Sequence, residues 1–264
     1  MPFHYIEGLK FYSFSTFGKD VRHGIFTRLG GVSPKPWNYL NLGGTVGDDT
    51  KRVNRNRQLM FDSLKLDVQS LFDVWQVHGT SLVLVDEPRR LHEPIQKADI
   101  ILTNQPSVTL MMRFADCTPI LLHDPVQRVI GMVHAGWMGT VNGAAKIAIE
   151  AMVDRYGSKP EDIRAGIGPS IGPDHYEVGE NVALEVLKTF GENSPVLKEQ
   201  LNGKIYFDLW EGNRILLQKS GVQNIEVAGL CTACKLEDWY SHRAEKGKTG
   251  RFGALITLEV LDGR

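Results

Sequence analysis

Six short β-rich runs follow one another between residues 74 and 134, and this series restricts the fold more than any other feature of the chain. The runs are Val74 to His78, Leu82 to Asp86, Ile100 to Thr103, Val108 to Arg113, Pro119 to His123 and Val129 to His134. Several links between them have the length of hairpin loops and are too short for the helices that join strands in a doubly wound fold. The series therefore predicts a β-sheet core in the middle of the chain.

Helical spacing of apolar residues occurs outside this series. We predict helices at residues 51–64, 138–156, 180–190 and 209–219, and further strands at 24–27, 163–167, 205–209, 225–228 and 254–260. The sequence has no internal repeat and no interdomain linker. The predicted fold class is therefore α+β (mixed α/β), with a single domain over residues 1–264 and a β-sheet core flanked by helices.

Charge and cysteine content exclude several classes of protein. The chain has 30 Lys and Arg against 31 Asp and Glu, a formal charge of −1, whereas proteins that neutralise many phosphates of a nucleic acid carry a basic excess. No run of about 18 apolar residues and no signal-peptide pattern is present, so we expect neither a membrane span nor export. Three cysteines do not make a disulfide framework, which favours a reducing cytoplasm. The oligomeric state has no signal in the sequence.

Three of the β-rich runs end in a residue that binds metals. These residues are His78, Cys117 and His134, and they lie 39 and 17 residues apart. Two imidazoles and a thiolate suit zinc, and three protein ligands leave a fourth position open, as in catalytic zinc sites. This spacing differs from that of a zinc finger, so the fold must bring the residues together. From the pattern alone, three unrelated polar residues in core strands remain the alternative.

The same residues allow two other chemistries. Cys117 is also a candidate nucleophile, with His134 or His78 as its base, in a hydrolase or deamidase. A His2Cys set can also hold one copper ion, although a multicopper oxidase needs many more ligands, and no His-x-His pair is present. The remaining cysteines form an isolated C-x-x-C, Cys231 to Cys234, near which only His242 is close in sequence, and we interpret them as a reduced pair.

Motifs along most of the chain match a known family in order. They are Thr27-Arg28-Leu-Gly-Gly-Val-Ser33, Leu40-Asn41-Leu42-Gly43, Gly47-Asp48-Asp49, Asn56-Arg57, Gln76-Val-His78-Gly79, Ala98-Asp99, Ala115-Asp116-Cys117-Thr-Pro119, His134-Ala-Gly-Trp137, Gly168-Pro-Ser-Ile-Gly172, Tyr176-Glu177-Val178, Ser241-His-Arg243 and Thr249-Gly250-Arg251. Over about residues 22 to 258 the chain resembles the bacterial laccase-domain family, also called polyphenol oxidases and now described as purine nucleoside phosphorylases.

The resemblance implies a fold, a metal and a reaction. The fold is that of the laccase domain, similar to cytotoxic necrotizing factor, and the metal is zinc on His78, Cys117 and His134, with copper as the alternative. The substrates implied are phosphate and adenosine, inosine, guanosine or S-methyl-5′-thioadenosine, with deamination of adenosine as a second activity. Two residues depart from the family pattern. Met138 stands where Arg or Lys is common, which removes a cation, and His175 stands where Cys is common.

Further site residues follow from the chemistry that the resemblance implies. Phosphorolysis needs cations around a phosphate dianion, and the candidates are Arg28, Arg57, Arg243 and, first among them, Arg251. Trp137 is a candidate to stack on a purine, and Asn41 or Gln76 to hydrogen-bond the base or the ribose. Asp116 and Asp99 are candidates to move protons in deamination, or to orient a histidine ligand.

Overall fold

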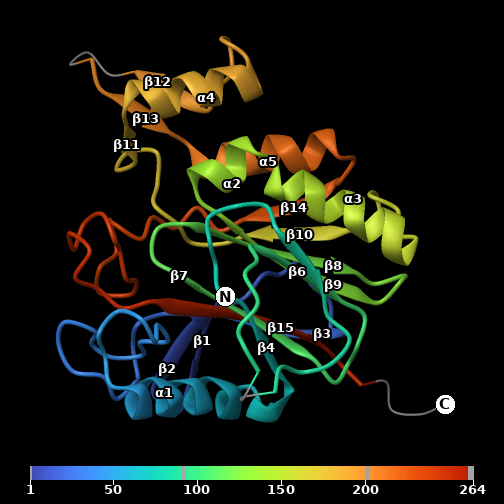
Figure 1. The fold of residues 1–264 in the computed structure, drawn as a ribbon, viewed down its shortest axis with the longest axis vertical. Helices are drawn as coiled ribbons and strands as arrows, with labels where there is room; N and C mark the ends of the chain where they lie inside the picture. The colour runs from blue at the N-terminus through green and yellow to red at the C-terminus, as the bar shows by residue number, and fades with distance from the viewer. Residues whose placement is uncertain (1, 91–92, 200–202, 261–264) are drawn as a thin grey trace.

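Two six-stranded β-sheets lie face to face at the centre of the molecule, within the residues 2–90, 93–199 and 203–260 that this computed structural model describes (Figure 1). In order across the first sheet, the strands are β1 (Phe3–Ile6), β2 (Leu9–Tyr12), β3 (Val21–Phe26), β15 (Phe252–Leu258), β7 (Thr109–Phe114) and β4 (Leu71–Asp73). The second sheet runs β14 (Asn224–Val227), β10 (Arg164–Ile167), β8 (Thr118–Asp124), β9 (Val129–Ala135), β6 (Ile100–Thr103) and β5 (Leu82–Leu84). Most neighbouring strands are antiparallel, but β4 with β7, β5 with β6 and β10 with β14 are parallel.

Both faces of each sheet are buried, which explains why the central strands are apolar along their whole length. On β7, Leu110 and Met112 pack between the two sheets, whereas Met111 belongs to the core on the outer face. On β8, Leu121 lies between the sheets, while its neighbours Ile120 and Leu122 pack outward. Because side chains alternate between the faces of a strand, one apolar run supplies two cores.

Helices cover the two outer faces. Helix α1 (Thr50–Ser63) lies against the first sheet, and its N-terminus is capped by Asp49, whose side chain accepts from the amides of Lys51 and Arg52. Helices α3 (Ala144–Tyr156) and α5 (Leu209–Lys219) pack on the second sheet. The molecule thus has four layers, with α1 at the bottom of Figure 1 and α3 and α5 above the sheets.

A smaller unit extends beyond α5, at the top of Figure 1. It contains α4 (Glu180–Phe190) and a three-stranded sheet in the order β11 (Glu177–Val178), β13 (Ile205–Phe207) and β12 (Leu197–Glu199). Its own apolar cluster includes Val186 and Phe207 and reaches α2 (Trp137–Val141). A turn of 3-10 helix, η1 (Val68–Ser70), precedes β4.

The structure confirms the α+β class and corrects several elements. The helix predicted over 138–156 is divided into α2 and α3, because Gly143 adopts a left-handed backbone with φ of 75°. The strand predicted from Val74 to His78 is wrong: β4 ends at Asp73, and the following residues form a loop with one isolated bridge, Trp75 to Lys97. Strands β1, β2, β4, β11 and β12 were not predicted. Among the described residues, no helix has the length and apolar character needed to cross a membrane.

Candidate metal centre and its surroundings

His78, Cys117 and His134 lie together at one end of the sheet pair. One donor atom from each residue lies within 4.8 Å of the other two. His134 is on β9, and Cys117 is in the short link that carries the chain from β7 in the first sheet to β8 in the second. Register pairs Pro119 of β8 with His134 of β9, so the residue just before β8 comes close to this histidine. The fold therefore supplies the convergence that sequence spacing does not.

Asp99 fixes the orientation of the two histidines. One carboxylate oxygen, Oδ1, lies 2.7 Å from His134 Nδ1 and accepts from the amide of His78 at 3.0 Å. The other, Oδ2, accepts from the amide of Gly79 at 2.7 Å. With Nδ1 engaged by the carboxylate, His134 has Nε2 left to serve as a metal donor. A carboxylate behind a histidine ligand is a recurring feature of zinc sites. The residues present thus fit zinc, and Asp99 acts as a positioning residue.

Two backbone features serve this arrangement. His78 has a φ of 60°, a left-handed conformation that costs a non-glycine residue about 1–3 kcal/mol. Hydrogen bonds from the loop amides to Asp99 hold it in place. At Gly136, an added Cβ would lie 2.9 Å from Cys117 Sγ and 3.6 Å from His78 Cδ2. Any side chain at this position would crowd the donor atoms.

Charges within the cluster favour a thiolate beside an imidazolium when no metal is bound. Burial acts to raise the pKa of Cys117, but His134 and His78 outweigh it and lower that pKa to about 6. Burial acts to lower the pKa of His134, but Cys117 and Asp99 outweigh it and raise that pKa to about 9. Burial also acts to raise the pKa of Asp99, yet hydrogen bonds from His134 and Gly79 hold it below its usual range. A thiolate is the form of cysteine that binds metals.

Asp116, next to Cys117, is a buried carboxylate with donors on both oxygens. Oδ1 accepts from the Thr232 hydroxyl at 2.7 Å, and Oδ2 accepts from the backbone amide of Arg243 at 2.6 Å. Its φ of 85° is again left-handed. Asp116 therefore ties the Cys117 link to two segments of the C-terminal part of the chain.

Of the four predicted arginines, the structure brings two to this region. Arg243 donates from its guanidinium to the carbonyl of Glu177 at 2.9 Å and lies over the ring of Tyr176. Arg251 donates to the carbonyl of Gly250 at 2.8 Å. Burial lowers the pKa of Arg251, and the charges of Cys117 and Asp116 oppose that shift. Neither guanidinium lies within 4.0 Å of a carboxylate among the described residues.

The other two arginines are engaged elsewhere. Arg28 is buried, donates to the carbonyls of Asn38, Leu236 and Trp239, and pairs with Glu245 at 3.1 Å. Arg57 on α1 lies 3.9 Å from Asp73, a carboxylate that also pairs with Arg89 and Arg113. Both arginines have structural partners away from the metal ligands.

The remaining predicted residues also have protein partners. Asn41 is fully buried; its amide oxygen accepts from the backbone amides of Gly43 and Arg251, and its amide nitrogen donates to Asp48. The side-chain amide of Gln76 pairs with the backbone of Arg113, at 2.7 and 2.9 Å. Trp137 is half-buried and packs against the apolar cluster of the small α4 unit.

Tyr176 is a residue near the site that the sequence analysis did not assign. Burial raises the pKa of its phenol, and the negative charges of Cys117 and Asp116 raise it further, while Arg243 acts in the opposite direction. The phenol therefore stays protonated near neutral pH and is available as a hydrogen-bond donor. Its only signal in the sequence is its place in the Tyr176-Glu177-Val178 motif.

Comparison with known proteins decides the family. The family described as multi-copper polyphenol oxidoreductase laccase matches residues 22–259. The chain belongs to this laccase-domain family. Its relatives there include a purine nucleoside phosphorylase, YlmD, of Bacillus subtilis (strain 168), 36% identical over 91% of this chain and 90% of that protein. The purine nucleoside phosphorylase of Deinococcus radiodurans is 38% identical, with 92% of each chain covered.

Solved structures of laccase-domain proteins have the same fold. YlmD from Geobacillus stearothermophilus superimposes with a TM-score of 0.92 at 32% identity, covering 98% of this chain and 99% of that one. The YfiH protein of Bacillus licheniformis gives a TM-score of 0.88 at 33% identity over the same shares of the two chains. The resemblance stated from the motifs is confirmed.

Proposed function

We propose that this laccase-domain protein is a zinc-dependent purine nucleoside phosphorylase. The observation that carries the proposal is the pairing of an open donor set, His78, Cys117 and His134, with two arginines that lack carboxylate partners among the described residues. The names of the relatives support the same reaction. The substrates proposed are inorganic phosphate and adenosine, inosine, guanosine or S-methyl-5′-thioadenosine.

Arg243 and Arg251 are proposed to bind the phosphate. In phosphorolysis a phosphate oxygen attacks C1′ of the ribose while the bond to the purine breaks and the electron pair leaves with the base. Two guanidinium groups compensate the dianion and hold it for attack. Asn41 contributes indirectly, because its amide oxygen accepts from the backbone amide of Arg251 and so fixes the segment that carries it.

The metal ligands are proposed to provide the electrophilic side of the site. When bound, zinc supplies a Lewis acid that polarises a substrate atom or lowers the pKa of a water molecule. Asp99 holds the His134 ring so that Nε2 stays available, and Cys117 contributes a thiolate. The phenol of Tyr176 is a hydrogen-bond donor suited to a substrate oxygen or ring nitrogen.

Deamination of adenosine is proposed as a second activity of the same site. Water must add at C6 of the purine, and protons must move so that ammonia can leave. Asp116 is the candidate for this proton transfer, because its carboxylate adjoins Cys117 and each oxygen keeps acceptor capacity beyond the hydrogen bond it already receives.

All three cysteines are free in the structure, which supports the cytoplasm as the compartment.

A cysteine hydrolase or deamidase is the second candidate function. The pKa of Cys117, lowered to about 6, and that of His134, raised to about 9, describe a thiolate and imidazolium pair of the kind that activates a nucleophile. In this alternative Cys117 attacks the substrate itself and no metal is needed. Removal of metal separates the two mechanisms, and metal analysis of the active protein separates zinc from copper and a phosphorylase from a copper oxidase.

The test is product analysis with adenosine, inosine, guanosine and S-methyl-5′-thioadenosine, with and without phosphate. We expect free base and ribose 1-phosphate, or its methylthio analogue, only when phosphate is present, and inosine from adenosine without it. Arg251→Ala and Arg243→Ala should raise the KM for phosphate at least tenfold, about 1.4 kcal/mol. Arg55→Ala, an exposed arginine on α1, is the matched control.

Three outcomes would contradict the proposal. Phosphate-independent base release from every nucleoside would indicate hydrolysis. Full activity in a metal-free preparation, lost on Cys117→Ala, would favour the thiol nucleophile. Oxidation of a phenol with stoichiometric copper bound would favour the polyphenol oxidase.

A further inference from the structure

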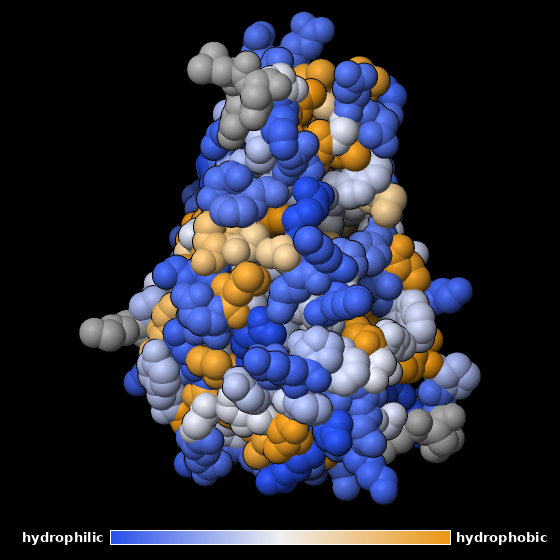
Figure 2. All heavy atoms as spheres, turned by 90° about the vertical axis from the view of Figure 1, so that its left-hand side faces the viewer, coloured by the Kyte–Doolittle hydropathy of each residue, from blue (hydrophilic) through white to orange (hydrophobic). Residues whose placement is uncertain are grey.

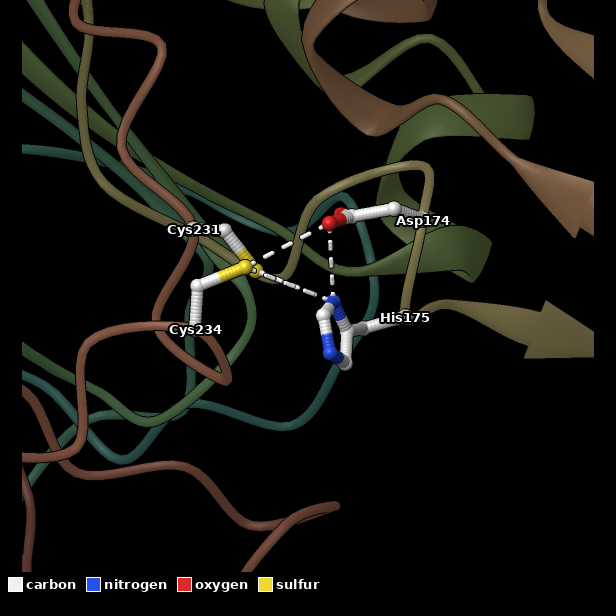
Figure 3. A group of neighbouring side chains, drawn as sticks. All are labelled: Asp174, His175, Cys231 and Cys234. Carbon is white, nitrogen blue, oxygen red and sulfur yellow. Dashed lines mark hydrogen bonds and ion pairs between the residues drawn. The ribbon is translucent and has the colours of Figure 1, made fainter.

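A second group of metal-binding side chains lies outside the site described above. Asp174 and His175 come from the loop between β10 and β11, and Cys231 and Cys234 come from the segment that follows β14. One donor atom from each of the four residues lies within 4.8 Å of the other three. Figure 3 shows the two sulfurs, the Asp174 carboxylate and His175 Nδ1 facing a common point. The structure brings these residues, and not the sequence neighbour His242, to the C-x-x-C pair.

Most distances among these donors fall in the range expected around one tetrahedral zinc ion. Cys234 Sγ lies 3.5 Å from His175 Nδ1 and 3.3 Å from Asp174 Oδ2. Cys231 Sγ lies 3.8 Å from His175 Nδ1, which lies 3.0 Å from Asp174 Oδ2. With metal bonds of about 2.3 Å to sulfur and 2.0–2.1 Å to nitrogen or oxygen, tetrahedral angles separate the donors by about 3.3–3.8 Å. The 3.0 Å between His175 Nδ1 and Asp174 Oδ2 is below this range, so these two donors must move apart by about 0.3 Å to bind such an ion.

The backbone around the group is built to bring the two segments together. Ser170 and Cys231 form a parallel bridge, in which the amide of Ser170 donates to Leu230 and the amide of Thr232 donates to Ser170. The amide of Gly172 donates to Cys231 Sγ at 3.1 Å. A Cβ on Gly172 would lie 2.7 Å from Asp174 Oδ1 and 3.1 Å from Cys231 Cβ. Only glycine permits this approach.

We propose that Asp174, His175, Cys231 and Cys234 bind a structural zinc ion. Two thiolates and an imidazole select a soft or borderline metal over magnesium or calcium, and four protein donors complete a tetrahedron. No position is left for a substrate, so the ion has a structural role. This inference does not depend on the phosphorylase assignment, because it uses none of the residues that form the first site.

The ion would fasten two loops that also reach the first site. The hydroxyl of Thr232, next to Cys231, donates to Asp116 at 2.7 Å. His175 is followed by Tyr176, over whose ring the Arg243 guanidinium lies, with 5.3 Å from Arg243 Cζ to the ring centroid. We call Asp174, His175, Cys231 and Cys234 the outer group, and His78, Cys117 and His134 the inner group. Metal at the outer group therefore limits the motion of the segments that carry Tyr176 and support Asp116. Its loss is expected to lower thermal stability more than catalytic rate.

Metal content of the full-length chain, expressed with zinc and purified under reducing conditions, tests the proposal. We expect about two zinc ions per chain in the wild type and about one in the Cys231→Ser/Cys234→Ser variant. Cys117→Ala should lose the other ion and keep the outer one. His4→Ala removes an exposed histidine that belongs to neither group and should keep both ions. Cobalt in place of zinc should give sulfur-to-cobalt absorption that the double variant weakens and Cys117→Ala does not abolish.

A second measurement on the unmodified chain covers the case in which the double variant does not fold. Cys234 is exposed, so bound zinc should slow its alkylation by iodoacetamide, and a chelator should restore fast alkylation. The proposal is overturned if wild type and double variant hold equal zinc, or if Cys234 reacts equally fast with and without zinc. A Cys231–Cys234 disulfide that persists in zinc-supplemented protein overturns it as well.

Discussion

The two groups of metal-binding side chains differ in what holds them. His134 and Cys117 are placed by the register of β8 on β9 and by the link between the sheets, and the loop that carries His78 is fastened to Asp99 through the His78 backbone amide. The outer group lies on two loops and is partly open to solvent, with the side chains of His175 and Asp174 44% and 59% exposed. The inner donors are three and the outer donors four. A rigid protein framework can position three ligands and leave the fourth metal position open. Flexible loops, in contrast, are fixed by the metal only when they supply all four of its ligands.

The loops that carry the outer group lie on a largely hydrophilic face of the molecule. The red segment of Figure 1, which contains the C-x-x-C pair and the arginine motifs, lies on the face that Figure 2 turns toward the viewer. Hydrophilic atoms predominate on this face, with apolar side chains scattered among them.

Removal of Cys117 should have the largest effect and should separate the groups most clearly. We expect Cys117→Ala to lower kcat/KM for phosphorolysis by about 10³-fold or more, equivalent to about 4 kcal/mol, because the open site loses its thiolate. Cys234→Ser, the matched change in the outer group, should lower it by less than about tenfold and should lower the melting temperature instead. Equal losses of activity in the two variants would show that the Cys117 thiolate has no role in the reaction beyond that of a structural ligand.

Histidines that bind no metal offer a contrast in pH dependence. Burial, and then the charge of Arg164, lower the pKa of His123 to about 4, whereas the pKa of His134 in the inner group is raised. Between pH 6.5 and 4 the unfolded chain binds a proton at His123 that the folded chain does not, so stability falls as the pH falls. The expected loss is about 3 kcal/mol. Denaturant unfolding of wild type and His123→Phe across this range measures it, since acid release of metal affects both alike. Parallel curves would refute the assignment.

Asp99→Asn tests how far metal binding by the inner group depends on the hydrogen bonds that the Asp99 carboxylate accepts. An amide can accept fewer of the hydrogen bonds that now come from His134 and the loop amides, so the histidines lose their fixed orientation. We expect the zinc affinity of the inner site to fall about 10- to 100-fold. Competition with a chromogenic chelator measures this affinity, and the outer site in the same sample is the internal reference. An equal change at both sites would show that the effect is global.

Gly136→Ala should give the smallest of these effects. The added methyl group lies 2.9 Å from Cys117 Sγ and must displace the thiolate or the helix start beside it. We expect zinc affinity at the inner site to fall about tenfold, and stability by about 1–3 kcal/mol from overpacking. Gly44→Ala is the matched control, because an added Cβ there has no atom within 4 Å among the described residues. A wild-type affinity in Gly136→Ala would show that the thiolate is not held in place.

Much of the fold was predictable from local pattern, and the errors have local causes. The helices expected at 51–64, 180–190 and 209–219 were found within one residue, because their apolar residues repeat with the helical period and α1 and α5 begin at the capping residues Asp49 and Asp208. The strand expected from Val74 to His78 fails because Asp99 binds the amides of Val77, His78 and Gly79 that a ladder would need. Competition between a side chain and a neighbouring strand for backbone amides about 20 residues away cannot be predicted from the local sequence pattern.

The two groups of metal-binding residues also differ in how far the sequence could predict them. His78, Cys117 and His134 could be named because each stands in a motif of the family, although no spacing rule brings them together. The outer group could not be completed, since Asp174 and His175 lie more than 50 residues before the cysteines and sequence proximity pointed to His242. Of the arginines, Arg28 and Arg57 share their motif status with Arg243 and Arg251, and only the ion pairs of the folded chain separate them.

The left-handed backbone at His78 limits which side chains can replace it. Asn, Asp and His tolerate a φ of about 60° better than other non-glycine residues, while β-branched residues tolerate it poorly. Of these three, Asp and His are also good zinc ligands. Evolution or design could therefore exchange His78 for Asp at low conformational cost, but His134, which lies in a strand, is under no such restriction. The chain geometry, independently of the metal, thus narrows the range of ligands at one position of the site.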